Sequence, residues 1–186
     1  MTHFEYITVA LSIVLALSIA RCLDALAAAF DPSRRYWVHF TWLMVKLSNP
    51  LVFWWSMWEF RESHDWTFLS FLGAMLVAGT LYLQVNTLVT TNPDAVSDWR
   101  SHYYAKHRLF FGANVFLLLQ LFITAQLAMD ESFLNPWAIF QMTMILLSTT
   151  AMVSKNPTVH GWVAVLGGLK MFVMSFGVTA GRSMTG

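Results

Sequence analysis

The sequence predicts an all-α integral membrane protein, a bundle of about six transmembrane helices with one interfacial amphipathic helix. Composition is the first observation: 57% of the 186 residues are hydrophobic and only 11% are charged, whereas soluble domains contain roughly 25% charged residues. The second is that the apolar residues form continuous runs of about 20, enough for a helix to cross ~30 Å of hydrocarbon. A transmembrane β-barrel would instead show alternating strands of about ten residues.

Charge and cysteine content exclude several classes of protein. The 11 basic and 10 acidic residues give a net charge of +1, so no nucleic-acid partner is expected. Cys22 is the single cysteine, which excludes a disulfide framework and a zinc site built from cysteines. The partner that the composition does imply is the lipid bilayer.

Six segments are long and apolar enough to span a membrane. They are residues 5–29, 36–60, 66–90, 109–129, 133–154 and 158–181. Asp31-Pro32 closes the first segment, while Asn135-Pro136 and Asn156-Pro157 each place an N-cap residue before a proline at the first helical position. Since the segments use most of the chain, residues 1–186 are expected to form a single transmembrane domain.

The stretch 92–108 is the one sizeable connection between the predicted spans. Trp99, Tyr103 and Tyr104 lie within it, and such aromatic side chains favour the headgroup boundary. We therefore expect an interfacial amphipathic helix lying on the membrane surface here.

Positive charge is unequally divided between the two sides of the predicted bundle. One side holds six basic residues: Arg34, Arg35, Arg100, Lys106, Arg108 and Lys155. The other side holds only Arg61 and Arg182. By the positive-inside rule the first side is cytoplasmic, and both termini are predicted on the non-cytoplasmic side.

Four ionisable residues lie inside the predicted spans, where each costs roughly 2.5–3.5 kcal/mol and commonly marks a functional site. Two of them, Arg21 and Asp24, are three residues apart and share one face of a helix, so they can form an ion pair. Asp24 is alternatively a proton-carrying acid, or a counter-ion for a lysine on another helix.

Lys46 lies near the middle of the second span, just before Asn49 and Pro50. Proline lacks a backbone N–H, so Pro50 frees the carbonyl of Lys46 four residues earlier. The second span is therefore expected either to kink at this point or to break into two half-helices. Transporters use such broken helices to bind ions and substrates near the membrane midplane.

Lys170 lies near the middle of the last span. Two central lysines with a single acid inside the spans leave an excess of positive charge, which favours anions in a membrane pathway. In the alternative, burial holds one lysine neutral and it titrates during turnover. We expect Lys46, Asn49 and Lys170 to line a pathway or ligand-binding site, with Asp24 and Arg21 as supporting polar groups.

Four of the six histidines fall near the predicted cytoplasmic face. They are His39, His102, His107 and His160, and they are candidate ligands for a metal ion or a haem, with Asp94 and Asp98 as candidate carboxylate ligands. The sequence has no HExxH motif and no evident pair of histidines on facing helices. The favoured interpretation is that they are interfacial side chains without a cofactor.

Three short motifs are similar to those of a group of small bacterial multi-pass membrane proteins. The motifs are FEYITV at 4–9, YWVH at 36–39 and FWWSMW at 53–58. This resemblance implies a location in the bacterial inner membrane. It implies no activity and assigns no site residues.

The leading functional hypothesis is a small membrane channel or transporter, for an anion or coupled to protons, with its polar pathway at a broken second helix. Because one bundle of this size has little room for a wide pore, a homo-oligomer is expected. The alternatives are a non-catalytic scaffold, sensor or accessory subunit of a larger membrane complex, and a redox subunit that binds haem or metal. An enzyme is less expected, since no nucleophile elbow, P-loop or dinucleotide fingerprint is present.

Overall fold

The computed structural model describes residues 3–62, 66–129 and 135–180, and all regular structure within them is helical. The elements are α1 (His3–Phe30), α2 (Trp37–Ser56), the 3₁₀ turn η1 (Met57–Phe60), α3 (Phe68–Leu88), the 3₁₀ turn η2 (Pro93–Ala95), α4 (Trp99–Met129), α5 (Pro136–Val153) and α6 (Pro157–Ala180). The predicted all-α bundle is confirmed. Pro136 and Pro157 begin α5 and α6 as expected, and the Asn135 side chain caps α5 by accepting from the Ala138 N–H at 2.7 Å.

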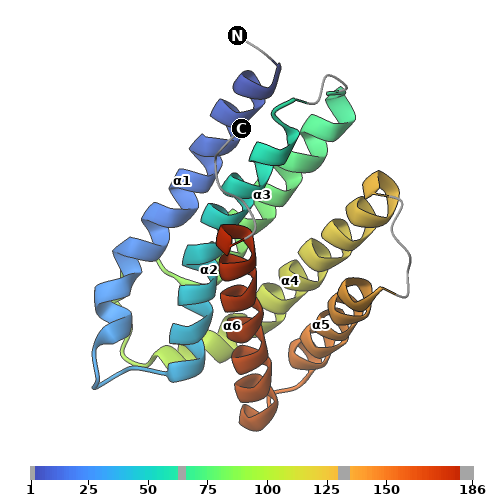
Figure 1. Ribbon diagram of the computed structural model, residues 1–186. Helices are drawn as coiled ribbons and strands as arrows, with labels where there is room; N and C mark the ends of the chain where they lie inside the picture. The colour runs from blue at the N-terminus through green and yellow to red at the C-terminus, as the bar shows by residue number, and fades with distance from the viewer. Residues whose placement is uncertain (1–2, 63–65, 130–134, 181–186) are drawn as a thin grey trace.

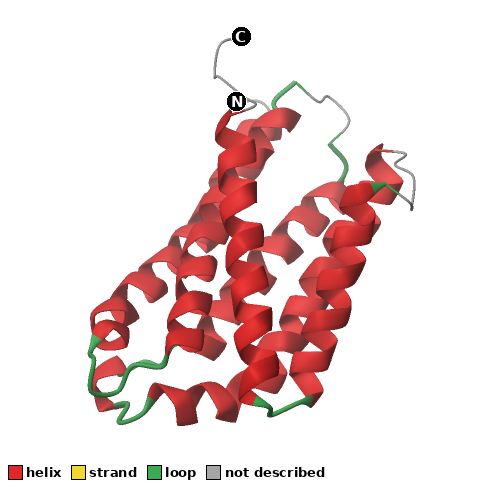
Figure 2. Cartoon of the chain, turned by 60° about the horizontal axis from the view of Figure 1, so that its bottom comes forward, coloured by secondary structure: helices red, strands yellow, loops and turns green. Residues whose placement is uncertain are grey.

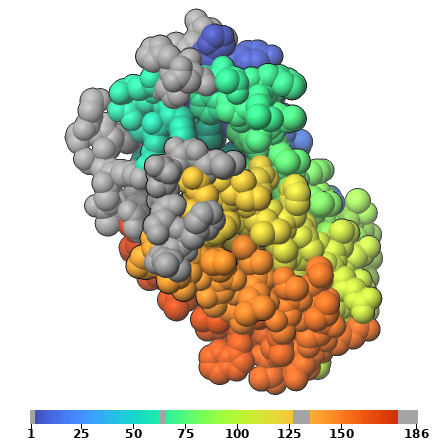
Figure 3. Space-filling model, turned by 90° about the vertical axis from the view of Figure 1, so that its right-hand side faces the viewer, coloured from blue at the N-terminus to red at the C-terminus, as the bar shows by residue number. Residues whose placement is uncertain are grey.

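Successive long helices run in opposite directions along the bundle (Figure 1). Neighbouring helices make a closed ring in the order α1, α3, α4, α5, α6, α2 and back to α1, and α2 also contacts α3 and α4 across the interior. The side chains of α3, α4 and α5 fill one outer face of this ring (Figure 3). The helix α2 therefore contacts four other helices, α1 and α6 beside it in the ring and α3 and α4 across the interior.

Five helices, all except α2, are long and apolar enough to cross a membrane by length and composition. At 20 residues, α2 has the same reach of about 30 Å, but its sequence includes Lys46, Asn49 and Pro50. Its buried residues include Trp42, Leu43 and Lys46, which contact other helices instead of lipid. An internal helix of a bundle can carry polar groups that a lipid-facing helix cannot.

One end of the bundle, here called the basic end, holds the connections α1–α2, α3–α4 and α5–α6 (Figure 2). Arg34 joins the first two of these connections. Its guanidinium donates to the Asp31 carboxylate at 3.0 Å and to the backbone oxygens of Asp94 and Val96 at 2.8 and 3.0 Å. Of the six basic residues predicted to share one side, Arg34, Arg35 and Lys155 lie in these connections, and Arg100, Lys106 and Arg108 lie in the first three turns of α4. Arg182 of the opposite group lies outside the described residues.

The predicted interfacial helix differs from the structure, because residues 99–108 form the first turns of α4. Trp99 and Tyr103 are buried against other helices and are not exposed on an outer face. The Trp99 indole N–H donates to the Ala28 carbonyl at 3.0 Å, which ties the start of α4 to the end of α1. Asp98 caps the new start by accepting from the N–H groups of Arg100 and Ser101 at 2.9 and 3.0 Å.

The predicted break of the second span is wrong, since α2 is one helix that continues through Pro50. Pro50 is itself buried, and packing around it supports the turns on both sides. Proline is tolerated inside membrane helices because neighbouring helices and hydroxyl side chains satisfy the freed backbone groups. Lys46 is therefore held by an intact helix.

Candidate functional site

A connected layer of polar side chains crosses the interior of the bundle. It comprises Lys46 on α2, Gln84 on α3, Asn114 on α4 and Ser148 on α5, and is called the polar layer below. The Asn114 amide oxygen accepts from the Lys46 ammonium at 2.9 Å and from the Gln84 amide at 3.4 Å. The Asn114 amide nitrogen donates to the Ser148 hydroxyl at 3.0 Å. Asn114 thus joins all four helices.

The polar layer lies where two hydrophobic clusters meet. One cluster includes Val85 and Phe111 and extends toward the basic end, and the other includes Leu81 and Leu117 and extends toward the opposite end. Along α3 and α4 these clusters come directly before and after Gln84 and Asn114. The four side chains are 2, 0, 5 and 0% exposed in chain order. The layer is therefore sealed by apolar side chains above and below.

The hydrogen bonds of the polar layer are incomplete. An ammonium group has three donors, and Lys46 uses one of them on Asn114, with no second acceptor among the residues that the structure describes. The faces of Trp42 and Phe110 lie 5.4 Å from its Nζ and offset part of the charge. The Gln84 Oε1 atom is buried without a partner. Two N–H donors of Lys46 and the Gln84 acceptor atom therefore lack hydrogen-bond partners among the described residues of the polar layer.

Lys170 on α6 has surroundings of the same kind. Its ammonium donates to the Gln141 amide oxygen on α5, and the rings of Trp137 and Phe140 lie 5.6 and 5.8 Å away. Lys170 and Lys46 repel one another electrostatically. Each lysine is thus paired with one neutral amide and two aromatic rings.

No carboxylate compensates either lysine within the described parts of the chain, where every ion pair joins an arginine to an acid. The acidic group that acts on Lys46 is the Cys22 thiol, and a buried free cysteine behaves as a small hydrophobic residue. Lys46, which is buried, and Lys170, which is partly buried, therefore both lack an anionic partner among the described residues, and this is costly for Lys46 in a low-dielectric interior.

The other expected pathway residues lie outside the polar layer. The expected Arg21–Asp24 pair does not form: the Arg21 guanidinium donates to Asn86 Oδ1 at 3.3 Å, and Asp24 is exposed on the outer face of α1. Asn49 is partly buried and makes no side-chain hydrogen bond to another described residue. These residues flank the candidate site, but the structure does not bring them to Lys46.

The sequence suggested interfacial side chains, but three of the four candidate histidines are buried and His102 is partly buried, and they form two pairs in the basic half of the bundle. The rings of His107 and His160 meet edge to face with 5.5 Å between centroids, and those of His39 and His102 do so at 6.4 Å. His160 bonds to the Tyr103 hydroxyl at 2.8 Å through Nδ1 and to the Ser154 carbonyl at 2.9 Å through Nε2. Both its ring nitrogens are therefore occupied.

A metal site is not assembled around these pairs in the described chain, which brings no three His, Cys, Asp or Glu side chains into a metal-binding group. His39 bonds to the Leu88 carbonyl at 2.9 Å and stacks on Trp99 at 4.5 Å. Asp98 is committed to capping α4, and Asp94 pairs with Arg34 at 3.8 Å. These contacts fasten the basic ends of the helices together.

Two carboxyls outside the spans have pKa values that hydrogen bonds lower. The Ser33 hydroxyl and N–H hold the pKa of Asp31 below its usual 3.8, and Arg34 contributes less. The Ser101 hydroxyl and the Arg100 N–H do the same for the pKa of Asp98. Both carboxylates belong to the connections at the basic end.

Sequence reasoning missed Asn114 and Gln141, which accept from the two lysines, and Gln84 and Ser148, which bond to Asn114. The signal was present, since all four lie inside predicted spans. An uncharged amide in a membrane helix seeks a partner on another helix. Amides on helices other than those of the lysines were therefore the residues to add.

Comparisons with known proteins add no assignment. No family model, no curated protein and no solved structure matches this chain.

Proposed function

We propose that this multi-pass membrane protein is a carrier for a small anion, and that the anion binds at the polar layer beside Lys46. The observation that carries the proposal is the buried Lys46 ammonium, which has a neutral amide partner and two unused N–H donors. A small anion would accept hydrogen bonds from those donors and would supply the negative charge that no described carboxylate provides.

The residues around Lys46 give such an anion a defined environment. The Ser148 hydroxyl, which accepts from Asn114, has its own proton free to donate. Lys170, which acts electrostatically on Lys46, would add a second positive charge to the surroundings of the anion. An anion held by an ammonium and a hydroxyl, with a second cation nearby, is bound by charge-assisted hydrogen bonds in a dry site.

A carrier suits this geometry better than a permanently open channel. Every member of the polar layer is at most 5% exposed, and apolar clusters cover it toward both ends. Entry therefore requires helices to move relative to one another, as in alternating access. The interface between α5 and α6 is smaller than that between α4 and α5. Separation of α5 from α6 would therefore open a path to the polar layer with the loss of fewer contacts.

The location and assembly are part of the same proposal. The basic end, with Arg34, Arg100 and Arg108, would face the cytoplasm by the positive-inside rule, and the bacterial inner membrane is the proposed compartment. Several copies would assemble as a homo-oligomer, with one anion site in each bundle. Light scattering of the detergent-solubilised protein measures the number of copies.

The test is anion flux from proteoliposomes loaded with chloride, nitrate or formate, measured with and without an imposed proton gradient. Lys46→Met removes the ammonium but keeps the length of the side chain. The matched control is Lys155→Met, because Lys155 is exposed at the basic end and outside the polar layer. Circular dichroism and gel filtration establish that both variants fold.

We expect flux of at least one of the three anions from the wild type and from Lys155→Met. In Lys46→Met the same flux should fall at least tenfold. Equal flux from folded Lys46→Met and Lys155→Met would overturn the proposal, as would no flux of any of the three anions from the wild type. Dependence of the flux on the proton gradient would identify proton coupling.

A further inference from the structure

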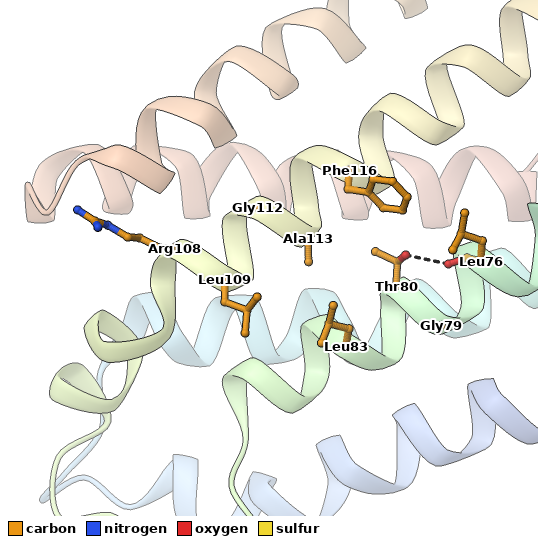
Figure 4. Close-up of a pocket in the computed structure, with 9 residues that line it drawn as sticks. All are labelled: Leu76, Gly79, Thr80, Leu83, Arg108, Leu109, Gly112, Ala113 and Phe116. Atoms are coloured by element: carbon orange, nitrogen blue, oxygen red, sulfur yellow. Dashed lines mark hydrogen bonds between the residues drawn. The ribbon is translucent and has the colours of Figure 1, made fainter.

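The outer surface of the bundle carries a groove between α3 and α4, away from the polar layer. Its volume is about 470 Å³. Figure 4 shows it lined from α3 by Leu76, Gly79 and Leu83 and from α4 by Leu109, Gly112 and Phe116. The lining runs along α4 from Arg108 to Phe116, which corresponds to about 12 Å of helix.

The floor and walls of this groove are apolar. Thr80 is the one uncharged polar side chain in its lining, and its hydroxyl donates its proton to the Leu76 carbonyl at 2.8 Å, so the lining between the two helices offers no free donor apart from Arg108 (Figure 4). At Gly79 an added Cβ would meet no atom within 4 Å. The missing side chain there keeps the groove open.

Arg108 is the charged residue of the lining and lies at the end of the groove nearest the basic end (Figure 4). It is exposed, and its guanidinium makes no hydrogen bond or ion pair with any other residue that the structure describes. The groove therefore combines an apolar surface about 12 Å long with one exposed cation at its end nearest the basic end. An apolar surface matches the acyl chain of an anionic lipid, and a cation matches its headgroup.

We propose that this groove is a binding site for an anionic phospholipid. One acyl chain lies between α3 and α4 along Gly79 and Gly112, and the phosphate accepts hydrogen bonds from the Arg108 guanidinium. Basic residues beside grooves between membrane helices bind anionic headgroups by this charge complementarity. Each basic residue near the surface is worth about fivefold in affinity for an anionic lipid.

The test compares binding of dioleoyl phosphatidylglycerol and dioleoyl phosphatidylcholine to the intact protein in detergent by native mass spectrometry. Arg108→Gln removes the cation, and Lys106→Gln is its control, because Lys106 is exposed two residues away and does not line the groove. Gly79→Leu fills the groove. Gly73→Leu is its control, because Gly73 is also open but lies outside the lining.

Wild type and Lys106→Gln should bind phosphatidylglycerol about fivefold more tightly than phosphatidylcholine, and Arg108→Gln should lose that preference. Gly79→Leu should weaken binding of both lipids, whereas Gly73→Leu should not. Equal behaviour of Arg108→Gln and Lys106→Gln would overturn the proposal. So would a Gly79→Leu variant that binds both lipids normally but assembles into fewer copies, since the groove would then hold a second copy of the chain.

Discussion

The Lys46 ammonium donates a 2.9 Å hydrogen bond to the Asn114 amide oxygen, and the two side chains are only 2 and 5% exposed. This bond joins α2 to α4 across the interior of the ring of helices. A buried cation whose partner is a neutral amide has little electrostatic compensation from the protein itself. This bond lies at the centre of the polar layer, and its loss would leave the buried ammonium without a hydrogen-bond acceptor.

Replacing Asn114 should destabilise the protein. Asn114→Leu leaves the Lys46 ammonium without its acceptor and should lower the free energy of unfolding by about 1–3 kcal/mol. Adding Lys46→Met should restore part of the loss, because the buried cation is then removed, although Gln84 and Ser148 still lack their bonds to Asn114. Unfolding in mixed detergent micelles measures the coupling. Combining Asn114→Leu with Lys155→Met is the control, and full additivity in both pairs would contradict the prediction.

Gly167 on α6 is required by the close approach of Trp42. An added Cβ would lie 2.7 Å from the Trp42 ring, which is buried and packs against Phe110 and Phe111. Gly167→Ala should therefore destabilise the protein by about 1–3 kcal/mol. Gly73→Ala, where the added Cβ meets no atom within 4 Å, should leave stability unchanged or raise it. Thermal unfolding compares the two, and equal midpoints would contradict the assigned contact.

Arg34 should be the most important basic residue of the connections. Arg34→Gln loses bonds to Asp31, Asp94 and Val96 and should cost at least about 1 kcal/mol of stability. Arg35→Gln is the matched control, since Arg35 is exposed and has no bond of this kind to a described residue. Chemical unfolding followed by helix circular dichroism measures both. A larger loss in Arg35→Gln would show that the connections are held differently.

Stability should depend on pH through Asp31 and Asp98. Hydrogen bonds lower both pKa values from their usual 3.8. A carboxyl with a depressed pKa in the folded state contributes stability above its unfolded pKa and loses it as pH falls through the folded pKa. The contribution of Asp31 and Asp98 to the thermal midpoint should thus be constant above about pH 5 and fall between about pH 4 and pH 2.

The variant with both Asp31→Asn and Asp98→Asn tests the origin of this acid sensitivity. It should have a lower midpoint than the wild type at neutral pH and a smaller fall on acidification. An acid-induced fall as large as that of the wild type would assign the effect to other carboxyls.

The positions of the helices could be predicted because long apolar runs and Asn-Pro pairs are local signals. Asn135-Pro136 marks the start of α5 to the residue. The start of α4 could not be found in this way. Trp99 is suited by composition to a membrane surface, yet in the structure its indole reaches Ala28 on another helix, and this tertiary contact decides its environment.

Of the candidate site, only the two lysines could be predicted from the sequence, and their amide partners could not. Lys46 and Lys170 are conspicuous because a charge in an apolar segment is rare. Their partners Asn114 and Gln141 come from α4 and α5, and hydropathy does not reveal which helices are neighbours. The same limit applies to Arg21, whose partner proved to be Asn86 on α3 and not the nearby Asp24.

The most direct test of the proposed anion site is a ¹⁵N nuclear magnetic resonance titration of the lysine side-chain nitrogens with chloride, nitrate and formate in turn at pH 6. The chain contains four lysines, at positions 46, 106, 155 and 170, and Lys46→Met assigns the resonance of interest. We predict that Lys46 gives an ammonium signal that shifts saturably with at least one of the three anions, while Lys155 responds weakly and without saturation. A Lys46 signal at the position of a neutral amine, or one that no anion moves, would contradict the central claim.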